Sequence, residues 1–364
     1  MTQQESRASR RGDKEKHRGQ DQGSGNHTGR EAAAPYVALT LQTTGIHPSS
    51  GRVVAVDAVV FEESGATVEE FHAVVNPGPH TNIGPTHYHG LSPAEIEQGR
   101  RFGSLLKKLD KLLDGRTLIV HDAPLTWGFL VSEARRAMNA AARANRSRAR
   151  RRGRNQGGRR QRVGHVPRPE VIVDTLATAY RAGAEFHDVR LAAVATAMGV
   201  PAGSPVASIS RAQRPEAEVT REDTLLLARL FRHARSAGAP IAERRPEELK
   251  PDAFGLQRSL VRVEATQAPR LHKNPGPYSP GGALSPGMEV VIAPEIAMDP
   301  NEVIAALTRA GLNYSEKLTR ATSVVVCNRA HHLRGKAMHA RRKGIPLLSD
   351  AAFMQAVGRI AGNA

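Results

Sequence analysis

The sequence predicts an α/β protein made of two units, a larger mixed sheet flanked by helices and a smaller α/β unit. Three apolar, valine-rich runs separated by short turns open the larger unit, and helical and strand-like patterns then alternate. A proline-rich stretch follows, and after it strands and helices alternate a second time. A chain of 364 residues has room for two domains at roughly 100–200 residues each.

These patterns divide the chain into four parts. Residues 1–34 are polar and lack periodicity, which predicts a disordered tail. Residues 35–236 form the larger unit, and residues 143–168 are an arginine-rich insertion within it. Residues 237–286 are predicted to be a proline-rich linker, and residues 287–364 form the smaller unit.

The larger unit begins with a predicted three-strand meander. Its strands are the apolar runs 36–39, 53–61 and 70–75, separated by glycine-containing turns. Ser92 followed by Glu95 is a capping-box pattern that predicts the start of a helix. Periodicity then predicts helices over 105–113, from about 125, over 191–198 and over 224–233, and a strand at 117–120. Residues 171–173 are either a strand or the entry to the next helix.

The smaller unit shows the same alternation on a shorter scale. Strands are predicted at 290–292, 323–327 and 346–348, and helices at 301–309, 335–342 and 351–360. Its apolar positions predict a core of Val290, Ile292, Leu307, Val324, Val326, Leu347 and Phe353.

Net charge is +17, and its distribution matters more than its total. Residues 143–162 contain ten arginines and no acid, a charge density that favours polyanionic partners and disfavours folding of the segment alone. We interpret the segment as a flexible arm for phosphate backbones; a solvated loop without function is the alternative. The segment has no aromatic residue, so we expect sequence-independent binding. The arginines predicted to bind nucleic acid are Arg146, Arg148, Arg150, Arg151, Arg152, Arg154, Arg159 and Arg160.

Other compositional features predict the compartment. Cys327 is the one cysteine, so no intrachain disulfide forms and a reducing compartment fits best. No apolar stretch approaches the roughly 20 residues needed to span a bilayer, and the N-terminal residues have no signal-peptide pattern. We expect a cytoplasmic protein, with association with the nucleoid as an open possibility.

Several motifs occur in order between residues 36 and 234. They are Leu41-Gln42-Thr43-Thr44-Gly45, Val75-Asn76-Pro77-Gly78, His89-Gly90-Leu91, Ile119-Val120-His121-Asp122-Ala123, Asp174-Thr175-Leu176 and Asp223 with the helix after it. Together they resemble the DnaQ-like 3′–5′ exonucleases, the family of the epsilon subunit of bacterial DNA polymerase III. The resemblance implies a ribonuclease H-like mixed sheet with flanking helices.

The same resemblance implies a degenerate active site. The family holds two Mg²⁺ ions with four carboxylates and uses a histidine as base. Here Thr40 and Gln42 occupy the first two carboxylate positions and Thr126 the third, while Asp223 keeps the fourth. Glu218 stands at the histidine position. The degenerate pocket is therefore predicted to be Thr40, Gln42, Thr126, Glu218 and Asp223.

Neutral oxygens do not balance two divalent cations, because Mg²⁺ prefers carboxylate ligands. We therefore assign no catalytic residue and expect no cofactor. Mg²⁺ or Mn²⁺ enters only if residual activity exists, with Asp223 as its ligand. Asp57, Asp122 and Asp174 lie near the motifs and are the candidates for a substitute ligand.

Residues 287–364 resemble a BRCT domain. The likeness rests on Gly287-Met288-Glu289-Val290-Val291, Ala310-Gly311, Thr322 to Val326, Gly335-Lys336-Ala337 and Gly344 to Asp350 before Phe353. Phosphopeptide-binding members usually carry Ser or Thr with Gly after the first strand, where this chain has Ala293-Pro294. Lys336 is the remaining candidate for a phosphate contact. The resemblance implies docking to replication or repair proteins, or to DNA ends.

Three hypotheses of function follow. The first is a non-catalytic or weakly active exonuclease-fold protein that binds nucleic acid, most simply DNA, in replication or repair. The second is an active epsilon-like 3′–5′ exonuclease with divergent metal ligands. The third is a protein-interaction scaffold whose basic segment is incidental.

Overall fold

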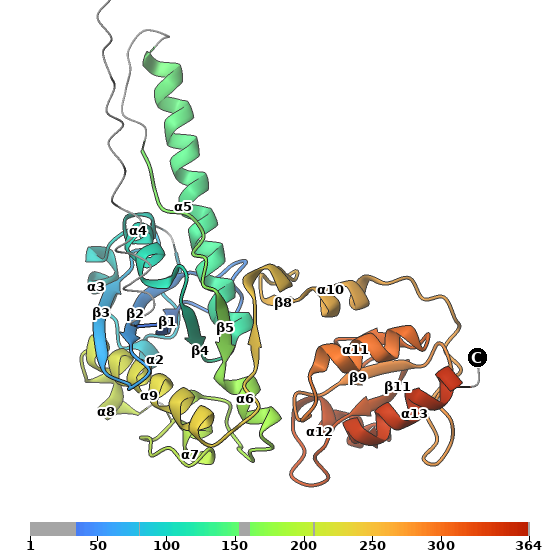
Figure 1. The fold of residues 1–364 in the computed structure, drawn as a ribbon. Coiled ribbons are helices and arrows are strands. Elements are labelled where there is room, and N and C mark those ends of the chain that lie inside the picture. The colour runs from blue at the N-terminus through green and yellow to red at the C-terminus, as the bar shows by residue number, and fades with distance from the viewer. Residues whose placement is uncertain (1–33, 80, 153–160, 207, 363–364) are drawn as a thin grey trace, which may run out of the picture.

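The computed structural model describes residues 34–79, 81–152, 161–206 and 208–362, which form two α/β units side by side (Figure 1). The predicted tail, residues 1–34, lies outside the described residues except for Ala34. Ala34 is buried, and its carbonyl accepts a hydrogen bond from the Arg116 side chain, so this residue belongs to the folded unit. No helix in the described ranges is both long and apolar enough to cross a membrane.

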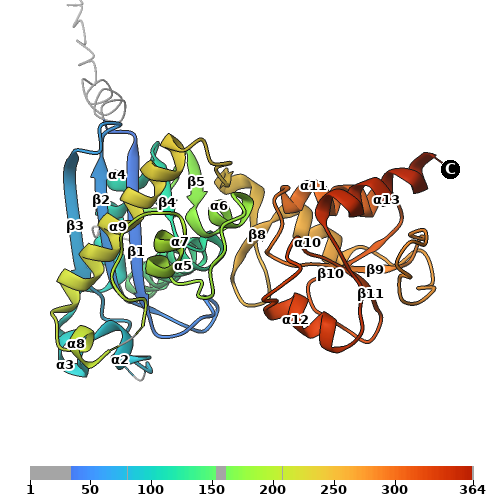
Figure 2. The same cartoon turned by 90° about the horizontal axis from the view of Figure 1, so that it is seen from below.

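The larger unit is built on a six-stranded mixed sheet of order β3-β2-β1-β4-β5-β6 (Figure 2). β1 pairs antiparallel with β2 and parallel with β4; β2–β3 and β5–β6 are antiparallel, and β4–β5 is parallel. The strands are β1 (Tyr36–Thr43), β2 (Val53–Phe61), β3 (Thr67–Val74), β4 (Thr117–Val120), β5 (Val171–Asp174) and β6 (Glu243–Arg244). The predicted meander and the α/β fold class are confirmed.

Helices cover both faces of this sheet. Their bounds are α2 (Thr86–His89), α3 (Pro93–Gln98), α4 (Phe102–Leu113), α5 (Ala123–Arg152), α6 (Thr175–Arg181), α7 (Leu191–Ala197), α8 (Ile209–Ala212) and α9 (Glu216–Ser236). α4 and α5 bury their apolar sides against Val37 and Leu39 of β1. α9 packs on the other face, against Ala38 and Ile119. The predicted capping box at Ser92 opens α3 as expected.

The arginine-rich segment differs from its prediction. Residues 143–152 are not a loop but the last turns of α5. Residues 161–168 run back along the unit: Asn145 exchanges two hydrogen bonds with the backbone of Gln161, and Val166 packs against the core. An alanine-rich helix already anchored by packing continues through the arginines, because alanine has the highest helix propensity and the end is solvated. Residues 153–160 lie outside the described residues.

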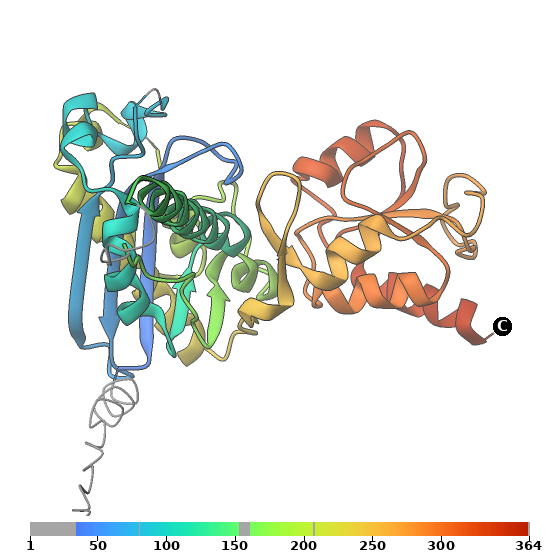
Figure 3. The ribbon, with the colours of Figure 1, turned by 90° about the horizontal axis from the view of Figure 1, so that it is seen from above.

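The predicted linker also differs, because much of it is folded. After β6 come a short 3-10 turn (Pro246–Glu248), the hairpin β7 (Leu249–Pro251) and β8 (Gln257–Ser259), and α10 (Leu260–Gln267). Leu249 packs on the core of the larger unit, whereas Tyr278 and Leu284 are buried in the core of the smaller one. Proline abundance was a poor guide here because proline sits readily at turns and edge strands. Figure 3 shows this segment joining the two units.

The smaller unit is a four-stranded parallel sheet of order β10-β9-β11-β12. Its elements are β9 (Glu289–Ile292), α11 (Pro300–Arg309), β10 (Asn313–Ser315), β11 (Thr322–Val326), α12 (Gly335–Arg342), β12 (Leu347–Leu348) and α13 (Asp350–Gly362). All the predicted core residues except Leu347 share one buried cluster with α11 and α13. Leu347 packs on the opposite face, beneath α12.

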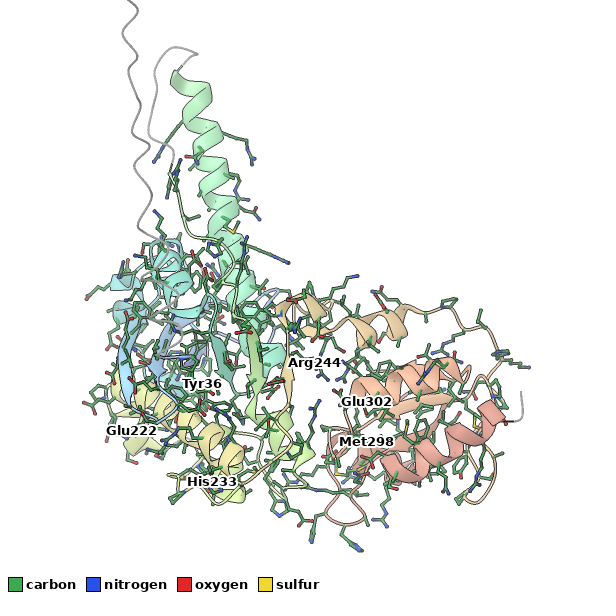
Figure 4. All side chains as sticks on the ribbon, viewed as in Figure 1. Tyr36, Glu222, His233, Arg244, Met298 and Glu302 are labelled. Carbon is green, nitrogen blue, oxygen red and sulfur yellow. The ribbon has the colours of Figure 1, made fainter. Side chains whose placement is uncertain are left out.

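Charged contacts join the two units. Asp299, at the N-terminus of α11, accepts a contact of 2.8 Å from Arg181 of α6 and a shorter one from Arg244 of β6. Arg244 lies at the junction of the units in Figure 4. Arg329 and Arg334 of the smaller unit donate to backbone carbonyls of residues 184–187. The smaller unit is therefore held against α6 and β6 instead of hanging on a free linker.

Candidate functional site

Gln42 is a buried residue of the β1 face that α9 covers. Its side-chain Nε2 donates to Oγ1 of Thr220 at 3.0 Å, and that hydroxyl donates to Oε1 of Glu216 at 2.6 Å. Gln42 is 4% exposed. At the second predicted carboxylate position, this amide therefore tethers β1 to α9.

Thr40 lies beside a larger charged cluster on the same face. The β1–β2 pairing sets Thr40 opposite Asp57, which is fully buried. Asp57 accepts hydrogen bonds from Arg221 of α9 at 2.9–3.1 Å and lies 3.3 Å from Nδ1 of His72. Burial acts to raise the pKa of Asp57, but the bonds from His72 and Arg221 outweigh it and hold the pKa below its usual value. Asp57 is thus an ionised structural carboxylate.

His72 completes this cluster from β3. Its Nε2 lies 3.2 Å from Oε2 of Glu216, so the imidazole sits between two carboxylates. Its contacts with Asp57 and Glu216 raise the pKa of His72 to about 9, against the desolvating effect of burial. At neutral pH the ring is therefore a cation that joins β2, β3 and α9.

This charge predicts a pH-dependent stability. A histidine whose folded pKa of about 9 exceeds its ordinary 6.5 stabilises the fold fully below pH 6.5. That contribution is lost as pH rises through about 9, and we expect it to be on the order of 2–3 kcal/mol. Urea unfolding of the wild type and of His72→Gln between pH 6 and 10 measures it.

A matched variant is needed because a second group titrates in the same window. Burial lowers the pKa of Lys336 to about 8, and its effect on stability with rising pH has the opposite sign. The difference between wild type and His72→Gln isolates His72. A difference that stays constant from pH 6 to 10 would contradict a charged His72 in the folded state.

Thr126 and His121 lie where β4 gives way to α5. Thr126 Oγ1 donates to the His121 carbonyl at 2.9 Å. The His121 ring contacts Thr175 Oγ1 through Nδ1 at 2.9 Å and the Val189 carbonyl through Nε2 at 2.6 Å. Burial lowers the pKa of His121, and because a carbonyl only accepts, Nε2 carries the proton of the neutral ring. Thr126 thus turns its hydroxyl toward the backbone.

Asp223 keeps its carboxylate but is paired with a cation. Nη2 of Arg211, on α8, donates to Oδ2 of Asp223 at 2.6 Å, and both side chains are about three-quarters buried. Burial raises the pKa of Asp223, and Arg211 opposes that shift. A guanidinium therefore neutralises the one carboxylate that the family motif retains.

Glu218 is separated from this pairing. Its side chain is 62% exposed and lies 3.8 Å from Arg214, one turn earlier on the chain. Surface pairs of this kind contribute little. The position that the resemblance assigns to a catalytic base thus carries a solvated acid.

Asp174 and Asp122, two of the substitute-ligand candidates, lie at the carboxyl ends of β5 and β4. Asp174 caps α6: Oδ1 accepts from Leu176 and Ala177, and Oδ2 accepts from the Ala123 amide. Asp122 has a left-handed φ of 58°. Burial, with Asp174 nearby, raises its pKa to about 6. Both aspartates line a cavity of about 250 Å³ between the two units. Arg211 and Asp223 do not line this cavity.

The donor set does not fit a two-metal centre. In the described parts of the chain, no group of three or more His, Cys, Asp and Glu side chains is arranged to hold a metal ion. Thr40, Gln42 and Thr126 are neutral, Asp223 is paired with Arg211, and Asp57 is paired with Arg221 and His72. Mg²⁺ needs several free oxygen ligands, preferably carboxylates, so these residues do not provide its site.

Of the predicted nucleic-acid contacts, Arg146 and Arg148 are exposed near the end of α5. Arg150, Arg151 and Arg152 continue that helix, and Arg154, Arg159 and Arg160 lie outside the described residues. Sequence reasoning missed Arg211, Arg221 and His72. They belong to no family motif, and Arg221 pairs with a residue 164 positions away, so only the fold brings them together.

Comparisons with known proteins give a family match to part of the larger unit. Residues 41–152 match the sequence model of the Exonuclease family, RNase_T, which is less than a third of the chain. The protein therefore contains an exonuclease-family domain, with relatives among epsilon-type subunits and 3′–5′ exonucleases.

Two relatives illustrate the extent of the match. A DNA polymerase III subunit epsilon-like protein of Rhodobacter capsulatus is 29% identical over 97 residues, 26% of this chain and 14% of that protein. The DNA polymerase III subunit epsilon of Rickettsia typhi is 28% identical over 98 residues, 27% of this chain and 43% of its own. The match thus spans less than half of either relative.

Solved structures give weaker likenesses. The crystal structure of a full-length 3′-exonuclease superposes with a TM-score of 0.42 at 13% identity, covering 63% of this chain and 67% of that one. Exonuclease I of E. coli in complex with an oligonucleotide superposes with a TM-score of 0.34 at 12% identity, covering 55% and 40%.

Proposed function

We propose that this protein is a non-catalytic or barely catalytic exonuclease-fold protein that binds nucleic acid in DNA replication or repair. The Arg211–Asp223 pair carries this proposal. Where the family resemblance places the fourth metal ligand, a guanidinium already neutralises the carboxylate at 2.6 Å. The other three ligand positions are Thr40, Gln42 and Thr126, which are neutral; the Gln42 amide nitrogen donates to Thr220 and the Thr126 hydroxyl donates to the His121 carbonyl.

Nucleic-acid binding is supported by charge. Residues 134–169, between Glu133 and Glu170, contain no acidic residue and carry most of the excess positive charge of the chain. Counterion release makes such a segment bind phosphate backbones without reading bases. On this proposal the binding needs no metal ion.

We propose the smaller unit as a BRCT-like docking module for a replication or repair protein. Its motifs and its parallel sheet with helices on both faces support this role. Lys336 is not free for a phosphate, because Nζ donates to the Ile292 carbonyl at 3.2 Å and lies 3.6 Å from Glu316. We therefore favour an unphosphorylated partner surface.

Metal titration tests the non-catalytic proposal. We expect calorimetry with Mn²⁺ or Mg²⁺ to give no saturable heat with the wild type. DNA binding should be at least as tight in EDTA as in Mg²⁺, because Mg²⁺ only competes with the arginines for phosphates. Thr40→Asp with Thr126→Asp is a gain-of-ligand variant, and Arg211→Ala frees Asp223 without adding an acid. Saturable two-site binding by the wild type would sink the proposal and favour an exonuclease with divergent ligands, with Asp122 and Asp174 as the next residues to replace.

A further inference from the structure

The end of α5 extends beyond the body of the protein. The helix has 30 residues, and at 1.5 Å per residue it is about 45 Å long. Its first half packs against the core through Trp127, Leu130 and Ala134, and Ala141 is the last buried residue among those α5 positions whose side chains are described. Figure 1 shows the later turns extending beyond the sheet and the other helices. We call residues 142–152 the arginine helix; over residues 142–148, where side chains are described, they are exposed or partly exposed.

The base of the arginine helix is fixed. Asn145 donates to the Gln161 carbonyl at 3.0 Å and accepts from the Gln161 amide at 2.9 Å. Further along the returning segment, the His165 amide donates to Asp110 at 3.0 Å, and Nε2 of His165 lies 2.8 Å from Asp114. These contacts hold the direction of the helix relative to the domain, so its arginines act as a fixed array.

The arginines with described side chains lie on two sides of this helix. Arg143, Arg146 and Arg148 are all exposed. At about 100° per residue, Arg143 and Arg146 lie roughly 60° apart, whereas Arg146 and Arg148 lie roughly 160° apart. A helix lying on a flat anionic surface needs charge on one side only. Charge on two sides suits a groove bordered by phosphates on both walls.

We propose that the arginine helix binds in the major groove of B-form duplex DNA, which deepens the proposed function and rests on it. The B-form major groove is about 12 Å wide and admits an α-helix. The major groove of A-form RNA is too narrow to admit side chains, and single strands are bound chiefly by aromatic stacking, for which the arginine helix, residues 142–152, has no aromatic ring. The contacts are to phosphates, so the binding is shape-dependent and not sequence-specific.

A helix-breaking substitution that preserves charge distinguishes the contribution of helical structure to DNA binding from the contribution of positive charge. Ser147 is exposed and lies inside the arginine helix, six residues beyond the buried Ala141. Ser147→Pro breaks the helix there without removing any arginine, so the charge is unchanged. Ser147→Ala is the matched control, because alanine preserves the helix. Fluorescence anisotropy with a duplex of roughly 20 base pairs, two helical turns, and with its single strand measures the affinities.

We expect Ser147→Pro to weaken duplex binding about tenfold or more and to change single-strand binding less than about twofold, with Ser147→Ala like the wild type. Replacing Arg143, Arg146 and Arg148 together by alanine should reduce the slope of log K against log salt by about 2.7, at 0.9 per phosphate. This variant keeps the test sharp if Ser147→Pro disturbs the fold.

The outcomes distinguish the two proposals. Unchanged duplex affinity in Ser147→Pro would overturn groove binding, and so would equal affinities for DNA and RNA duplexes or a preference for the single strand. A wild-type protein that binds no nucleic acid at low salt would overturn the proposed function itself. Binding to anionic vesicles but not to duplex DNA would assign the arginine helix to a membrane surface and also overturn the inference.

Discussion

Replacing Phe353 by alanine should lower the free energy of unfolding of the smaller unit by about 3–5 kcal/mol, one of the two largest effects we expect. The ring is fully buried at the start of α13 and packs in the cluster that contains Val290, Val324 and Leu307. Removing it deletes its apolar contacts and leaves a cavity, because close-packed neighbours relax only in part.

Urea unfolding of the full chain, followed by amide hydrogen exchange on β9 and β11, assigns the loss to this unit. Leu271→Ala is the matched control, since Leu271 is 79% exposed and its loss should stay within about 0.5 kcal/mol. If Phe353→Ala were as stable as Leu271→Ala, the ring would not be part of the core that joins α13 to the sheet.

Replacing Asp57 by alanine should cost a comparable amount, about 3–5 kcal/mol. Asp57 is fully buried, and its carboxylate satisfies both Arg221 and His72. Removing it leaves two partly buried cations with only Glu70 and Glu216 to balance them. Breaking one side of a buried ion cluster costs more than a surface pair, because the remaining charges stay desolvated.

Glu70→Gln is the control for this variant. Glu70 also pairs with Arg221, but it is 54% exposed, so its loss should cost no more than about 1 kcal/mol. Equal and small losses for both variants would show that the cluster does not hold α9 on the sheet. Asp57 would then be free to serve as a substitute metal ligand.

The fold was predictable from the sequence where the local pattern and the tertiary environment agree. β2 reads as a valine-rich run and is buried along its whole length, and Ser92 with Glu95 marks the start of α3. Short elements such as β10 and β6 give no such signal, because two or three residues carry no periodicity.

Two predictions were wrong for a shared reason. Charge density predicted disorder for residues 143–168, which is contradicted over the described residues 143–152 and 161–168, and proline content predicted an unstructured linker over residues 237–286. In both segments a few contacts outweigh composition: Asn145 with Gln161 in the first, and Leu249 with the core in the second. Composition reports average tendencies, whereas packing is decided by particular side chains.

The candidate site divides in the same way. The substitutions at Thr40, Gln42 and Thr126 are visible in the sequence because the motifs fix their positions. That Asp223 is neutralised by Arg211 is not visible, since Arg211 lies in a segment without a motif and reaches Asp223 only through the placement of α8.

The central claim, that this exonuclease fold does not hydrolyse DNA, is tested most directly with DNA labelled at its 5′ end. The DNA is incubated with the 364-residue chain in Mg²⁺ or Mn²⁺, beside Asp223→Ala and an active 3′–5′ exonuclease as positive control. We expect no shortening from the 3′ end, and no difference between wild type and Asp223→Ala. Metal-dependent shortening by the wild type that is abolished in Asp223→Ala would contradict the account.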